Sequence, residues 1–184
     1  IIFIIIMIPK QTNELLRLLA IQSPYSRARY KKDPEIPHIV LTGEVKLQAL
    51  KNFCEELFHE DHGSRDKHAI ILQANDPASD MEIFLNDPQL EGLLCYMTGN
   101  PIGPSSLSKA HILTCDACVL MTNKNSRDAH ASDHKNILTG LAMKKYILNQ
   151  TGSINLRLCM QLIKPESKQH YYSSVNLVSK EDQL

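Results

Sequence analysis

The strongest constraint on the fold is an alternation, from residue 36 onward, between short apolar runs and helix-length amphipathic segments. Such apolar runs predict buried strands, and the intervening segments space their apolar residues three or four apart, which predicts helices. Strands joined by helical crossovers form a mostly parallel, doubly wound sheet. The predicted fold class is therefore α/β and Rossmann-like. The expected strands are 37–43, 68–73, 92–100, 115–123 and 155–163, and the expected helices are 45–58, 81–87, 104–111, 133–148 and one that opens after Pro165.

The chain begins with the apolar run IIFIIIMI, followed by Pro9. It lacks the basic region and the cleavage site of a signal peptide. As a helix it would extend about 12 Å, too short for the roughly 30 Å hydrocarbon core of a bilayer. It is either the end of a longer membrane helix or a buried strand of a soluble domain. The basic excess that follows is typical of a cytoplasmic membrane exit, with Glu14 as the single acid before Asp33; its members are Lys10, Arg17, Arg27, Arg29, Lys31 and Lys32.

Composition narrows the class of partner. The 20 Lys and Arg residues balance the 20 Asp and Glu residues, and both signs are interspersed after residue 33, which disfavours nucleic acid as a partner. The five cysteines form an odd set, mostly within apolar runs. This pattern favours reduced thiols in a cytosolic compartment over a disulfide framework.

The loop after the first expected strand would hold phosphate in a nucleotide-binding sheet. It reads T-G-E, with Gly43 as its one glycine and Glu44 where pyrophosphate would lie. A carboxylate there repels phosphate. No Walker motif, nucleophile elbow or HExxH occurs in the sequence, so no catalytic or cofactor-binding residues are assigned. The pattern favours a binding or regulatory module over an enzyme.

Two acidic segments are candidate cation sites. The loop FHEDHGSRD (58–66) contains Asp61 among acids and imidazoles, and carboxylates with backbone carbonyls suit Ca²⁺. The segment RDAHASDH (127–134) places Asp128 and Asp133 after the fourth strand. The first could equally be an ordinary solvated loop, and the second could cap the next helix.

The order of these features resembles the Slo family of ion-activated potassium channels. The resemblance covers nearly the whole chain. It rests on HIVLTG, a helix ending in FHED, DACVLMTNK, D-x-x-A-x-D, NI and K-x-Y, and the last three motifs consist of Asp128, Ala131 and Asp133, of Asn136 and Ile137, and of Lys144 and Tyr146. It implies that residues 1–22 end the pore-lining helix and form its cytoplasmic exit, and that 23–36 are a linker. Residues 37–184 would then be most of the first of two RCK (regulator of potassium conductance) domains, truncated at the C-terminus.

The branch of the family is less sharply indicated. HIVLTGEVKLQALKNF resembles the large-conductance calcium-activated (BK) channels, and there the His-x-Asp of His59 and Asp61 implies calcium sensing by Asp61. Asp128 and Asp133 are weaker candidates, since D-x-x-A-x-D-H is similar to the sodium-activated branch, as is the pattern of Gln161, Lys164, Pro165, Glu166, Lys168 and His170. Where the family's magnesium site has glutamates, this chain has His68 and Leu94 or Cys95, which argues against Mg²⁺ sensing.

The resemblance further implies a homotetramer in the plasma membrane, cytoplasmic from about residue 23, with K⁺ as the transported ion. A cytosolic gating ring, completed by the second RCK domain, would couple Ca²⁺ and voltage to the pore through the linker with Arg27, Arg29, Lys31 and Lys32. That linker is bracketed by prolines and has no glycine, which favours stiffness, although a passive spacer is the alternative. Two other readings stay open: a soluble Rossmann-type enzyme or nucleotide-binding regulator, and a potassium-uptake subunit without its own pore.

Overall fold

The computed structural model describes residues 11–12, 23–59, 61 and 67–181 of the chain. The expected membrane exit, residues 1–9, lies outside these ranges. Among the described residues, no helix combines the length and the apolar character needed to span a bilayer. In chain order the elements are α2 (Pro24–Arg27), β1 (His38–Gly43), α3 (Leu47–Leu57), β2 (His68–Gln73), α4 (Ser79–Leu85), β3 (Leu94–Thr98), α5 (Pro104–Lys109), the 3₁₀ turn η2 (Ile112–Thr114), β4 (Ala117–Met121), α6 (Ala129–Thr151), β5 (Leu158–Met160) and α7 (Ser167–Glu181).

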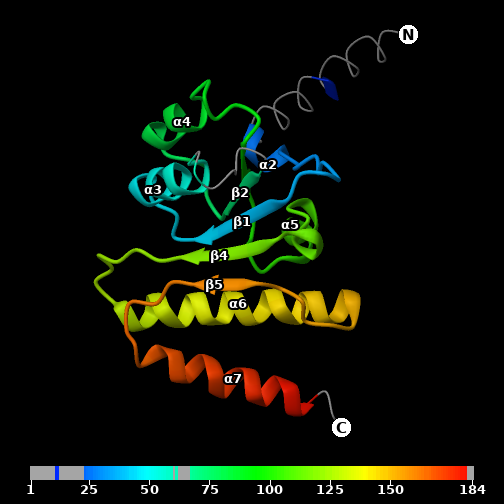
Figure 1. Ribbon diagram of the computed structural model, residues 1–184, viewed down its shortest axis with the longest axis vertical. Helices are drawn as coiled ribbons and strands as arrows, with labels where there is room; N and C mark the ends of the chain where they lie inside the picture. The colour runs from blue at the N-terminus through cyan, green and yellow to red at the C-terminus, as the bar shows by residue number, and fades with distance from the viewer. Residues whose placement is uncertain (1–10, 13–22, 60, 62–66, 182–184) are drawn as a thin grey trace.

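The strands form one five-stranded sheet in the order β3-β2-β1-β4-β5. Every neighbouring pair is parallel. The order reverses between β1 and β4, the place where doubly wound sheets bind ligands at the carboxyl ends of their strands. The prediction of a Rossmann-like parallel sheet is therefore confirmed (Figure 1).

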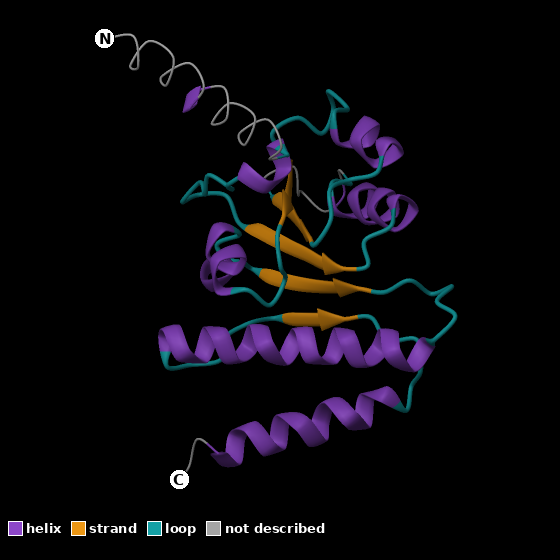
Figure 2. Ribbon diagram, turned by 180° about the vertical axis from the view of Figure 1, so that it is seen from behind, coloured by secondary structure: helices purple, strands orange, loops and turns teal. Residues whose placement is uncertain are grey.

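Both faces of the sheet are covered, because successive side chains of a strand point to opposite sides. Helices α5 and α6 cover one face and α3 and α4 the other; the helices lie around the strands in Figure 2. The first face buries a cluster that includes Val40, Ile70, Leu72, Met97, Leu107 and Met143. The second buries Leu41, Ile71, Leu50, Cys54, Met81 and Tyr96.

Helix α6 begins four residues earlier than the expected Asp133, at Ala129. The Asp128 carboxylate accepts a hydrogen bond from the Ala131 amide at 3.0 Å, which satisfies one of the free donors of the first turn. The helix ends at Gly152, whose φ of +70° suits a residue without Cβ. The expected start was therefore wrong, because apolar spacing marks the packed part of a helix and misses a polar first turn.

The C-terminal part also departs from expectation. The strand predicted over 155–163 is reduced to the three residues of β5, paired only with β4. Helix α7 packs on α6 and lies beyond it from the sheet (Figure 1).

Candidate functional site

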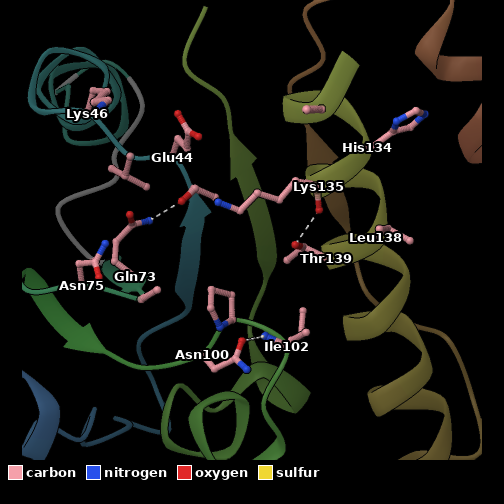
Figure 3. Close-up of a pocket in the computed structure, with 15 residues that line it drawn as sticks. Glu44, Lys46, Gln73, Asn75, Asn100, Ile102, His134, Lys135, Leu138 and Thr139 are labelled. Atoms are coloured by element: carbon pink, nitrogen blue, oxygen red, sulfur yellow. Dashed lines mark hydrogen bonds between the residues drawn. The ribbon is translucent and has the colours of Figure 1, made fainter. Parts of the chain in front are cut away.

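A cleft of about 870 Å³ opens at the carboxyl edge of the sheet, at the reversal of strand order. The turns after β1, β2 and β3 form one wall, and the first turns of α6 form the other (Figure 3). Lys135 extends from α6 toward the end of β1, whereas His134 points away from the cleft. The other polar residues that line the cleft are Glu44, Lys46, Gln73, Asn75, Asn100 and Thr139.

The turn after β1 is closed against β4. The amide of Glu44 donates to the Met121 carbonyl at 2.9 Å, and Gln73 Nε2 donates to the Gly43 carbonyl at 2.9 Å. A phosphate-binding turn instead aims its amides at the ligand. Since Glu44 both uses its amide on β4 and adds a carboxylate, this turn is poorly suited to pyrophosphate.

Asp61 lies at the opposite edge of the sheet from this cleft. Helix α3 leaves the carboxyl end of β1, and β2 must start at the amino end, so the segment between them returns to the amino edge. The Asp61 side chain is 85% exposed, and its Oδ2 lies 3.5 Å from His59 Nδ1. The rest of the predicted acidic loop, residues 60 and 62–66, lies outside the described residues.

Asp128 and Asp133 lie at the carboxyl edge, so they do not share a site with Asp61. Asp128 caps α6. Asp133 is fully buried and accepts hydrogen bonds from the amides of Ile163 (2.7 Å) and Lys164 (2.9 Å) and from Ser167 Oγ (2.7 Å). Its carboxylate holds the turn that leads into α7. This structural role explains an aspartate at this position without a bound ion.

Other residues of the resembling motifs also join elements together. Asn136 is buried, and its Nδ2 donates to the carbonyls of Met121 (3.1 Å), the last residue of β4, and Gln161 (3.2 Å), the residue after β5. Lys144 Nζ donates to Tyr171 Oη at 2.7 Å, joining α6 to α7. These motifs therefore stabilise the packing of α6 against its neighbours.

Ca²⁺ prefers six to eight oxygen ligands. Within the described part of the chain, no three His, Cys, Asp or Glu residues gather closely enough to hold a metal ion. Asp61 supplies an accessible hard ligand, but a complete calcium site would need further oxygens beside it. Asp133 is a poor ligand, because its oxygens are occupied by internal donors.

The basic residues Arg27, Arg29 and Lys31 of the predicted linker are exposed, and Lys32 is half-buried. Sequence reasoning missed two neighbours that fix this segment to the domain, Tyr25 and Tyr30. Tyr25 Oη donates to Glu82 at 2.9 Å, and Tyr30 is only 7% exposed. The sequence feature that could have indicated this packing is the presence of two aromatic residues in an otherwise polar stretch.

The fold is thus a parallel Rossmann-like sheet whose first turn is hydrogen-bonded to β4. A family model described as the calcium-activated potassium channel slowpoke-like RCK domain matches residues 35–177. The chain belongs to this Slo-like RCK family, which is a family of channel regulatory domains.

Relatives of known identity agree with this assignment. The chain is 26% identical over 175 residues to the calcium-activated potassium channel slo-1 of Caenorhabditis elegans, covering 91% of this chain and 14% of that protein. It is 25% identical over 162 residues to the Drosophila melanogaster calcium-activated potassium channel slowpoke, covering 84% of this chain and 12% of that protein. The chain thus spans about one eighth of these relatives.

Solved structures share the fold. The human SLO3 gating ring superposes with a TM-score of 0.58 at 16% identity, covering 74% of this chain and 21% of that chain. The GsuK RCK domain gives a TM-score of 0.50 at 13% identity, covering 79% of this chain and 27% of that chain.

Proposed function

We propose that this chain belongs to a ligand-gated potassium channel and forms part of its cytosolic gating ring, coupling intracellular Ca²⁺ and voltage to pore opening. The observation that carries the proposal is the match to slo-1, which covers 91% of the chain and so extends upstream of residue 23. In this proposal residues 1–22 end the pore-lining helix, 23–36 connect it, and 37–184 form most of the first RCK domain.

The proposed channel is a homotetramer in the plasma membrane, with residues from about 23 onward in the cytoplasm and a second RCK domain completing the ring. A cation shifts the gate only if it binds the open ring more tightly than the closed one, because equal affinities leave the equilibrium unchanged. Asp61 is the proposed calcium-sensing residue, since its carboxylate is exposed to an incoming ion. Mg²⁺ sensing is not proposed, because His68 and Leu94 or Cys95 stand where the family's magnesium site has glutamates.

The second candidate is a sodium-activated channel of the same family. The observation in its favour is the position of Asp128 at the carboxyl edge, where α6 meets the cleft. A soluble nucleotide-binding regulator is disfavoured, because the turn at Glu44 is closed against β4.

The test replaces Asp61 by Ala in the full-length tetramer and measures opening against Ca²⁺ and voltage. Loss of one hard ligand should weaken calcium coupling by about 1–3 kcal/mol, the usual allosteric range, and shift the calcium dependence to higher concentration. The shift should be partial, because the second RCK domain still senses calcium. Single-channel conductance should not change.

Asp80→Ala is the matched control, because it removes an equal exposed charge from α4. An intact calcium dependence in Asp61→Ala, together with loss of Na⁺ activation in Asp128→Ala, would replace this proposal by the sodium-activated one. If neither variant changed any ion dependence, the site assignment would be wrong.

The membrane assignment has its own test. The full-length chain should resist carbonate extraction from membranes, whereas a chain starting at Asp33 should be released. Release of both would contradict a pore helix before residue 23.

A further inference from the structure

We propose that residues 23–32 form a clasp that fixes the linker to both faces of the sheet, and that the Tyr30–His68 contact passes the effect of Asp61 to the linker. This inference rests on the proposed function for its second half. Its first half, the clasp itself, concerns the domain alone and can be tested separately.

Tyr30 anchors the clasp on the face covered by α5 and α6. Its Oη lies 2.8 Å from His68 Nδ1, and its ring centroid lies 4.8 Å from that of His38. His38 and His68 are register partners and the first residues of β1 and β2, so Tyr30 packs across two strand starts at once. The same ring meets His111 edge-on at 6.1 Å, and burial raises the Tyr30 pKa, which keeps the hydroxyl protonated as a donor.

Tyr25 anchors the clasp on the opposite face. Its ring packs edge-on against Tyr96 of β3 at 5.4 Å, and its hydroxyl donates to Glu82 of α4 at 2.9 Å. Between the two tyrosines, the Ser26 carbonyl accepts a hydrogen bond from Lys109 Nζ of α5 at 3.3 Å. The segment thus passes around the edge strand β3 and is held on both sides of it.

The clasp has a defined beginning. Ser23 caps α2 through a hydrogen bond from the Tyr25 amide to its Oγ at 3.1 Å, and the Ser26 amide and hydroxyl both donate to its carbonyl. A pull from the membrane side would therefore reach the domain first at Tyr25, before the start of β1.

The same contact links the clasp to the proposed sensor. His68 opens β2 seven residues after Asp61, at the amino edge where the structure places both. If ion binding at Asp61 displaced the start of β2, His68 would carry that displacement to Tyr30. His68 and Tyr30 are thus positioning residues that act between the sensor and the linker.

The clasp is tested by timed trypsin digestion of the full-length protein, with peptides quantified by mass spectrometry. Arg27, Arg29 and Lys31 are exposed, but cleavage beside them requires the clasp to open, so its rate follows the open population. Tyr30→Phe loses one neutral hydrogen bond and should raise cleavage within 27–32 about fivefold. Tyr30→Ala also removes the packing of a buried aromatic ring and should raise cleavage a hundredfold or more.

Cleavage at the exposed Lys124 and Arg127 of the β4–α6 loop serves as the internal rate standard. Tyr172→Phe is the matched control, because that ring is 54% exposed on α7 and outside the clasp. Wild-type cleavage rates within 27–32 in both Tyr30 variants would overturn the clasp. If Tyr30→Ala fails to fold, Tyr30→Phe still decides, since it keeps the ring.

The coupling half is tested by a double-mutant cycle in the full-length channel. Tyr30→Phe should shift the calcium dependence of opening in the wild-type background and have little further effect in Asp61→Ala. A merely structural role would make the two shifts additive, and additivity would overturn the coupling. Wild-type protein without calcium-dependent opening would contradict the proposed function, and the digestion result would still stand.

Discussion

The Oγ atom of Ser167 lies 2.7 Å from Oδ2 of Asp133, and this hydrogen bond ties the start of α7 to the buried side of α6. The Ile163 and Lys164 amides donate to the same carboxylate. One side chain thus satisfies three donors in the turn after β5. Its removal should therefore loosen α7 before it affects the sheet.

The first prediction concerns the stability of this connection. Asp133→Ala should lower the free energy of unfolding by about 3 kcal/mol, because buried donors are left unsatisfied. Thermal unfolding of the full-length chain measures the loss. The control is Asp116→Ala, whose exposed ion pair with Arg157 at 3.3 Å should be worth less than about 1 kcal/mol. Equal losses in the two variants would contradict the assigned role.

The second prediction concerns acid. Burial by itself raises the Asp133 pKa, but the hydrogen bonds from Ile163, Lys164 and Ser167 outweigh it and hold the pKa below its ordinary 3.8. The unfolded chain binds this proton more readily than the native chain. The contribution of Asp133 to stability is therefore fully present above pH 3.8 and is lost as the pH falls through the lowered pKa of the native state. When the free energy of unfolding is measured at decreasing pH, it should fall less steeply in Asp133→Asn than in the native chain.

The third prediction concerns His38, which is fully buried beneath Tyr30. Burial lowers its pKa from 6.5, outweighing the hydrogen bond between Nε2 and the His111 carbonyl. The unfolded chain therefore takes up a proton near pH 6.5 that the native chain resists, so stability should fall as the pH drops below about 6.5. His38→Leu should flatten this part of the pH profile, and a profile as steep as that of the native chain would contradict the role of His38.

The fourth prediction concerns Gly43, where β1 turns toward α3. Its φ is +92°, and a Cβ there would collide with the Met121 carbonyl oxygen. Gly43→Ala should cost about 1–3 kcal/mol for the backbone conformation alone, with the collision adding to it. Gly92→Ala is the control, since it shares a positive φ of +79° but has no atom within 4 Å of a new Cβ. A loss no larger at Gly43 than at Gly92 would show that the close approach of β1 to β4 is not required.

Several features of the fold could be predicted from the sequence because their signals are local. The β2 run HAIILQ matched the observed strand at both ends, and the apolar spacing of α3 was recognised within two residues at its start. Alternation of strands and helices allowed only a few topologies, so the parallel sheet followed. The Slo-family resemblance was likewise carried by short motifs, and the match over residues 35–177 confirms it.

The candidate site depended on tertiary structure, because distances between elements are not encoded in local patterns. Asp128 and Asp133 looked alike in sequence, yet one caps a helix at the surface and the other is buried among donors that lie some 30 residues further along the chain. Tyr30 looked like part of a spacer, but a contact with His68, 38 residues away, buries it. The periodicity of apolar residues determined which elements form; the packing of the sheet decided which polar side chains are structural and which remain free to meet an ion.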